Sequence, residues 1–110
     1  SNQYGDLTSI SLTAGDWDIT CLTYFSPNGA VVSRVVCGIG TVVGNDFTGL
    51  VAGDTITQYA PPAAVYDVTT SIPPKRVSLT GTETRYLKFL VSYSAGTPKA
   101  WGRISARRVR

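Results

Sequence analysis

Alternation between apolar and polar residues with a period of two runs through most of this chain, and it limits the fold more than any other sequence feature. The clearest run is residues 16–25, and the side chains that share its apolar face are Trp17, Ile19, Cys21, Thr23 and Phe25. The other face of this run is mostly polar, which is typical of a strand in a sheet with one buried side. No helical period continues beyond one turn. The sequence therefore predicts an all-β protein.

Turn-forming residues divide the chain into about seven or eight short strands. We expect strands at residues 7–13, 16–25, 31–43, 54–59, 65–70, 75–80, 84–94 and 99–110. A tight turn is expected at Ser26-Pro27-Asn28-Gly29, a rigid connector at 60–64 and a flexible N-terminal arm at 1–6. The spacing is typical of sandwiches and barrels. We therefore predict one domain, residues 1–110, folded as an antiparallel, jelly-roll-like β-sandwich.

The last quarter of the chain contains two alternating runs on either side of Ala95-Gly96-Thr97-Pro98, a pattern that predicts a hairpin. In the first run, the residues expected to face the core are Leu87, Phe89, Val91 and Tyr93. In the second run, the small apolar face consists of Gly102, Ile104 and Ala106, and the large or charged face consists of Trp101, Arg103, Ser105 and Arg107. We expect the second of these faces to point outward and to meet another molecule.

Positive charge is concentrated at the C-terminal end. The net charge is +3, no acidic residue follows Glu83, and half of the ten basic residues are Lys99, Arg103, Arg107, Arg108 and Arg110. A tryptophan flanked by arginines is typical of a binding hot spot. We therefore predict that the residues that bind a partner are Trp101, Arg103, Arg107, Arg108 and Arg110.

Two alternatives remain open at this point. Charge on a last strand also protects a sheet edge from aggregation without any partner. A slip of one residue in the register would turn Trp101 inward.

Nucleic acid is not an expected partner, because the charge is confined to one strand instead of lining a groove. No apolar run is long enough to span a bilayer, so we expect no membrane partner.

The sequence provides little for catalysis. It contains no His, which excludes a Ser-His pair or a histidine metal site. Asp16 and Asp18 point the same way from one strand, but a calcium site needs more oxygen ligands, so we expect exposed acids. We predict no catalytic, cofactor-binding or metal-binding residue.

Cys21 and Cys37 could lie near each other across neighbouring strands. We expect two buried free thiols in preference to a disulfide.

Both ends of the chain resemble a known family. The segment Ser9-Ile10-Ser11-Leu12-Thr13-Ala14-Gly15-Asp16-Trp17-Asp18 is similar to the Ser-Leu-Thr-Ala-Gly-x-Trp-Asp opening of small β-sandwich domains in tailed-bacteriophage virion proteins. Residues 76–80, 84–87, 95–97 and 102–110 resemble the closing hairpin of the same domains. The resemblance covers about half of the chain, and residues 26–74 lie outside it.

The resemblance implies a structural protein of the virion and no enzyme. It is greatest to the short decoration proteins that clamp neighbouring major capsid subunits from outside, and it implies a dimer or trimer on the outer capsid surface. Tail-fibre tips that recognise host polysaccharide share such domains and are the alternative. We expect the chain to be complete at 110 residues, and it has no heptad stalk, so decoration is favoured. The resemblance implies no catalytic residue in this chain.

Overall fold

The computed structural model describes residues 2–44, 47, 49–60 and 66–109. This part of the chain forms eight strands and no helix, as the alternation predicted. The strands are β1 (Asn2–Leu12), β2 (Gly15–Ser26), β3 (Val31–Gly40), β4 (Ile56–Tyr59), β5 (Val68–Ser71), β6 (Lys75–Leu79), β7 (Glu83–Ser94) and β8 (Lys99–Arg108). Most of the connector predicted at 60–64 and part of the loop after β3 lie outside the described residues.

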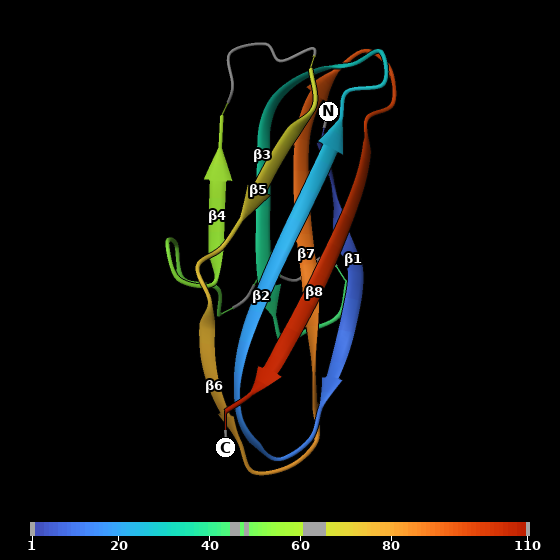
Figure 1. Cartoon of the computed structure of the whole chain (residues 1–110). Coiled ribbons are helices and arrows are strands. Elements are labelled where there is room, and N and C mark those ends of the chain that lie inside the picture. Colours follow the sequence, from blue (N-terminus) through green and yellow to red (C-terminus); the bar gives the residue numbers. More distant parts are fainter. Residues whose placement is uncertain (1, 45–46, 48, 61–65, 110) are drawn as a thin grey trace.

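Two antiparallel sheets pack face to face in an elongated sandwich of 45 × 21 × 20 Å. Sheet A has the order β1-β7-β3-β4. In sheet B, β2 is the central strand: β8 pairs along one of its edges, and β5 and β6 share the other. Figure 1 shows β2 and β8 in front of β3 and β7. The prediction of an antiparallel β-sandwich is confirmed, and most connections cross between the sheets.

The predicted hairpin between β7 and β8 is wrong. β7 pairs with β1 and β3 in sheet A, whereas β8 pairs with β2 in sheet B. The turn between them therefore carries the chain from one sheet to the other. It lies against the turn between β2 and β3, which also changes sheets, and Asn28 Nδ2 donates a hydrogen bond to the carbonyl of Thr97 at 3.0 Å. Alternation and turn residues were identified correctly, but they do not say which sheet the next strand joins.

The predicted flexible arm is also wrong for the part that the structure describes. Residues 2–6 are the first half of β1, and they pair with β7 from Asn2↔Ser92 to Asp6↔Lys88. The polar composition that suggested a loose end has a different cause: β1 is an edge strand, and its pairing rests on backbone hydrogen bonds that do not require apolar side chains. Ser1 lies outside the described residues.

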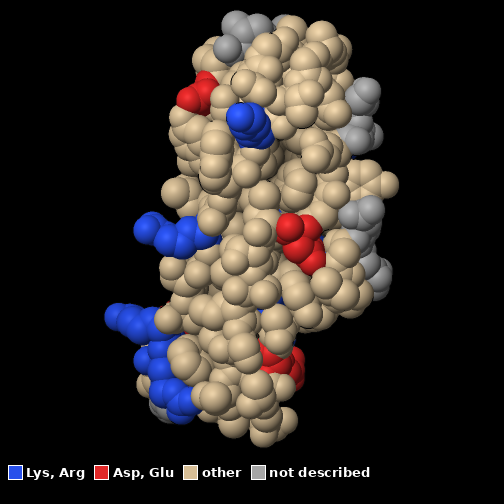
Figure 2. Space-filling view, turned by 90° about the vertical axis from the view of Figure 1, so that its right-hand side faces the viewer, with Lys and Arg blue, Asp and Glu red and all other residues tan. Residues whose placement is uncertain are grey.

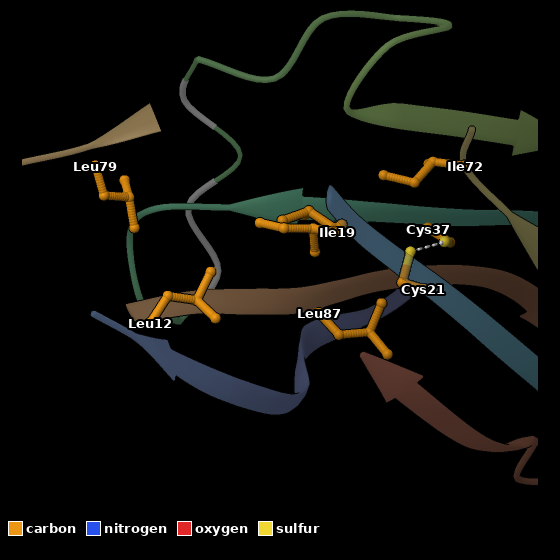
Figure 3. Packing of buried hydrophobic residues seen from close by; sticks show 8 residues of the cluster. Leu12, Ile19, Cys21, Cys37, Ile72, Leu79 and Leu87 are labelled. Carbon is orange, nitrogen blue, oxygen red and sulfur yellow. Dashed lines mark hydrogen bonds between the residues drawn. The ribbon is translucent and has the colours of Figure 1, made fainter. Parts of the chain in front are cut away.

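The core fills the space between the sheets with the inward side chains that alternation predicted. One cluster consists of Leu12, Ile19, Cys21, Cys37, Ile39, Ile72, Leu79 and Leu87 (Figure 3). A second consists of Phe25, Val32, Val35, Val68, Phe89 and Val91. Leu7 packs against both clusters, and Trp17 and Tyr93 are half-buried at their margins. The buried inward set explains why register is well specified, since a slip of one residue would expose it.

The small inward face of β8 lets this strand lie close to the core. Ile104 and Ala106 pack against the first cluster and Ala100 against the second. At Gly102 there is no room for any side chain, because a Cβ atom would lie 2.4 Å from Leu87 Cδ2. Small residues on one side of β8 therefore fix the direction of the large residues on its other side.

A buried ion pair lies on the outer side of sheet A. Lys88 is on the side of β7 that faces away from the core, yet it is 0% exposed. Its Nζ lies 2.7 Å from Asp6 Oδ1 and donates to the carbonyl of Gly44 at 3.0 Å. The N–H of Gly44 donates to the other oxygen of Asp6 at 2.7 Å. The Lys88 ammonium thus holds the loop after β3 against the strands.

Neighbouring residues are shaped around this lysine. The rings of Phe47 and Tyr86 have their centroids 5.9 and 5.6 Å from Lys88 Nζ, within reach of a cation–π attraction. At Gly40 a Cβ atom would lie 2.4 Å from Lys88 Cε, so the glycine leaves the space that the lysine stem occupies. Alternation alone predicts that Lys88 is exposed to solvent. It is buried because the loop after β3 covers it.

Removing the negative charge of Asp6 tests this pair. We expect Asp6→Asn to lower the free energy of unfolding by about 3 kcal/mol, because an uncompensated ammonium remains buried. Asp54→Asn is the matched control: Lys75 Nζ and Asp54 Oδ2 are also 2.7 Å apart, but these side chains are 33% and 47% exposed. The control should lose less than about 1 kcal/mol. Urea unfolding measures both, and equal losses would contradict the role given to Lys88.

Candidate interaction face

The outward residues of β2 and β8 form one continuous surface, here called the outer face of sheet B. The two strands pair in the antiparallel register Asp18↔Arg107, Thr20↔Ser105, Leu22↔Arg103 and Tyr24↔Trp101. All of these side chains lie on the side opposite Ile19, Cys21 and Phe25, which are buried. Burial of one side of each strand therefore forces this set of residues into solvent.

One end of the face is aromatic and apolar. Tyr24 and Trp101 are cross-strand partners with ring centroids 5.7 Å apart and planes tilted by 58°. The exposed fractions are 52% for Trp101, 41% for Leu22 and 39% for Tyr24. These side chains border a shallow hollow of about 250 Å³ together with Gly102 and Arg103. Three large apolar side chains side by side in water are unusual enough to indicate a contact surface.

The other end of the face is charged. Arg76, from β6, donates from Nε to Asp18 Oδ1 at 2.5 Å and from Nη2 to Oδ2 at 3.3 Å. Arg107 Nη2 is 3.9 Å from the same carboxylate and is 82% exposed. The hydrogen bond from Arg76 lowers the pKa of Asp18, opposed by desolvation and assisted by the charges of Arg76 and Arg107. One carboxylate thus faces two arginines, which leaves positive charge available to an acidic partner.

The structure brings together most of the predicted contact residues. Trp101, Arg103 and Arg107 project from the same side of β8, so the register in which Trp101 points outward is confirmed. Arg108 lies apart: its Nη2 donates to Thr13 Oγ1 at 2.6 Å and to the carbonyl of Ala14 at 2.9 Å, and its guanidinium lies over the Trp17 ring. Arg108 therefore closes the turn between β1 and β2. The prediction for Arg110 falls outside the described residues.

Leu22, Tyr24 and Arg76 belong to the face, although the sequence interpretation did not include them. The signal for two of them was present, because alternation placed Leu22 and Tyr24 on the mostly polar side of their strand. Two large apolar residues at outward positions indicate a contact surface more strongly than either does alone. What could not be known was that β8 would pair beside them and place Trp101 next to Tyr24.

The charge distribution agrees with this arrangement. Figure 2 shows the molecule from the side at the right of Figure 1, and Lys and Arg side chains project along its left-hand margin. β8 contributes Lys99, Arg103, Arg107 and Arg108 at exposed positions. Most of the viewed surface is uncharged. The exposed guanidiniums of β8 would favour approach of an acidic surface.

The carboxylates near the face are held by other side chains, and they do not gather into a metal site in the part of the chain that the structure describes. Among the described residues, no group of three or more His, Cys, Asp and Glu side chains could hold a metal ion. Asp16 accepts a hydrogen bond from Ser78 Oγ at 2.5 Å, and Asp18 faces arginines, so the two carboxylates do not form a pair. In the part of the chain that the structure describes, no helix has the length and apolar character of a membrane span.

The Tyr24 hydroxyl donates a hydrogen bond to Asp67 Oδ2, which anchors one ring of the aromatic pair. This bond and, to a smaller extent, desolvation and the charge of Asp67 raise the pKa of Tyr24. The contribution of the bond to stability is present below the usual tyrosine pKa of about 10 and is lost as the pH rises through the higher folded pKa.

Titration of tyrosinate absorbance tests this anchor. The difference between the wild-type protein and Tyr24→Phe isolates the titration of Tyr24, and we expect it at higher pH than that of an exposed tyrosine. Asp67→Asn should move it back toward the usual value, because the hydroxyl then loses its charged acceptor. The titration of N-acetyltyrosine amide in the same buffer provides the reference. A Tyr24 titration that coincides with this reference, or that Asp67→Asn leaves unchanged, would contradict the anchoring.

None of the family models, curated proteins or solved structures compared with the chain matches it. The functional interpretation therefore depends on the sequence motifs and on the geometry of the outer face of sheet B.

Proposed function

We propose that this protein is a decoration protein that binds the outer surface of a tailed-phage capsid and strengthens contacts between major capsid subunits. The observation that carries the proposal is the outer face of sheet B, where exposed aromatic residues lie beside arginines on two paired strands. Burial of aromatic side chains and arginines gives a protein contact most of its free energy. The resemblance of both ends of the chain to phage virion domains supports a capsid protein as the partner.

The flatness of the face supports a protein partner over a small ligand. Its hollow is shallow and is bordered by only a few side chains, Leu22 and Tyr24 from β2 and residues 101–103 from β8. Small ligands are usually bound in clefts that bury most of their surface. A sheet face with projecting rings instead matches a shallow groove on a larger surface.

Repetition on a symmetric shell would compensate for a modest contact. The central apolar group of this face consists of Leu22, Tyr24 and Trp101, which is few side chains for a tight complex. A capsid presents the same junction many times, and a protein that touches two subunits at once, or that binds as a dimer or trimer, gains avidity without new contacts. Bridging of subunits in this way would oppose their separation under internal pressure.

The second candidate is a receptor-binding tip of a tail fibre that recognises host surface polysaccharide. The observation that favours it is the Tyr24–Trp101 pair beside the hollow, because sugar rings stack on exposed aromatic rings. Location on the virion separates the two candidates. Labelled protein should mark the head if the proposal is correct; a label on the tail, together with binding of the purified protein to host polysaccharide, would favour the tip.

A substitution at the centre of the face tests the contact. We expect Trp101→Ala to weaken binding to capsids that lack the protein by about tenfold or more, the loss typical of a hot-spot residue. Tyr59→Ala is the matched control, since Tyr59 is 47% exposed and belongs to sheet A. Co-sedimentation with capsids measures both affinities. A control that loses as much as Trp101→Ala would place the contact elsewhere.

Removal of the protein tests the stabilising role. Virions assembled without it should release their DNA at lower temperature than wild-type virions, because each subunit junction loses a contact that holds it closed. Addition of purified protein should restore the release temperature, and Trp101→Ala should restore it less well at the same concentration. Release temperatures that do not differ between the two kinds of virion would contradict a decoration role.

A further inference from the structure

Two cysteines face each other between the sheets. Cys21 comes from β2 in sheet B and Cys37 from β3 in sheet A, and both side chains point into the core (Figure 3). Their Sγ atoms are 3.5 Å apart, with one thiol donating a hydrogen bond to the other sulfur. Both cysteines are free, as the sequence analysis predicted, and they are 5% and 0% exposed. The distance is short enough that a small movement of the side chains would bring the sulfurs to bonding distance.

The surroundings make the two sulfurs unequal. The hydrogen bond from Cys21 lowers the pKa of Cys37, against the effect of burial, and the neighbouring Thr23 hydroxyl lowers it further. The hydrogen bond to Cys37 and burial raise the pKa of Cys21. The lowered pKa favours loss of the first proton from Cys37, with the Cys21 thiol within hydrogen-bond distance of the resulting thiolate. A thiolate next to a thiol is the arrangement in which oxidation of one sulfur leads to a disulfide.

We propose that Cys21 and Cys37 are an oxidation site at which hydrogen peroxide forms a disulfide between the two sheets. The Cys37 thiolate attacks one oxygen of peroxide, the O–O bond breaks, and Cys37 becomes a sulfenic acid as hydroxide leaves. The Cys21 sulfur then attacks the Cys37 sulfur, the S–O bond breaks, and water leaves. In total, two thiols and one peroxide give one disulfide and two waters.

Three features favour this reaction over competing ones. Peroxide is close to water in size, whereas larger disulfide reagents would have to open the sandwich to reach a pair that is almost fully buried. The chain has only these two cysteines and no methionine, so no other sulfur within the chain competes for the oxidant. Burial also keeps a second protein molecule away from the Cys37 sulfenic acid, which leaves Cys21 as the sulfur that reaches it.

The disulfide would change stability and leave the outer face of sheet B in place. It would close a loop between positions 16 residues apart that contains the turn from β2 to β3. A cross-link of this length restricts the unfolded chain, and we expect the melting temperature to rise by about 5 °C or more. Cys21 points inward between Thr20 and Leu22, which point outward, so the bond forms on the side opposite the candidate contact surface.

Mass spectrometry of the folded protein is the test. Fully reduced wild-type protein is treated with hydrogen peroxide, denatured and alkylated. The expected product is a monomer that has lost two hydrogen atoms, takes up no alkylating reagent and melts at higher temperature than the reduced protein. Protein that keeps two alkylatable thiols, or that forms only intermolecular disulfides or sulfinic acid, would overturn the proposal. Because this readout uses the wild-type protein, it does not depend on whether any variant folds.

Trapping of the intermediate tests the order of the steps. In Cys21→Ala, the sulfenic acid at Cys37 has no partner, and a sulfenic-acid-specific reagent should trap it. When the wild-type protein is oxidised in the presence of the same reagent, the trapped fraction should carry the label on Cys37. A label mainly on Cys21 of the wild-type protein would overturn the assignment of Cys37 as the attacking sulfur.

Discussion

The structure depends on the strict alternation of β2. From Ile19 to Phe25, every second side chain of this strand is buried: Ile19, Cys21, Thr23 and Phe25 are between 0% and 5% exposed. The side chains between them therefore point to the solvent side of the sheet. Because β5, β6 and β8 all pair with β2, its register sets theirs as well. A slip of one residue would bury Asp18 without a partner and expose Phe25, so core and outer face are specified together.

Strand positions could be predicted from the sequence, but the sheet to which each strand belongs could not. The hydrophobic period indicates which side of a strand is buried, and for β7 and β8 the predicted inward side is the side that packs on the core. It does not report a pairing partner, because in a sandwich the buried sides of both sheets look alike. The turn at residues 95–98 has the composition of a hairpin and acts as a crossing between sheets. Residues 2–6 of the edge strand β1 have the composition of a loose arm, because their pairing rests on backbone groups.

Two features of the molecule arise from contacts between segments that are far apart in sequence, and this is why they escaped prediction. Lys88 is buried because a loop more than forty positions earlier folds over it and Asp6 meets it from β1. Tyr24 joins Trp101 because β8 pairs beside β2, and its hydroxyl is held by Asp67. Each residue alone reads as an ordinary outward lysine or tyrosine. In contrast, Trp101 and its neighbouring arginines were found because their signal is contained in one short strand.

A rigid sheet gives the outer face of sheet B an advantage in binding. Tyr24 and Leu22 alternate with Thr23 and Phe25, which are fully buried, so the backbone beneath the apolar end is fixed by the core. The tight fit of Gly102 against Leu87 fixes β8 beside it. Side chains held in this way lose less conformational freedom when a partner covers them, and more of the contact energy appears as affinity. The fold alone does not determine a binding partner. The exposed side chains on β2 and β8 therefore decide which surfaces the protein can bind.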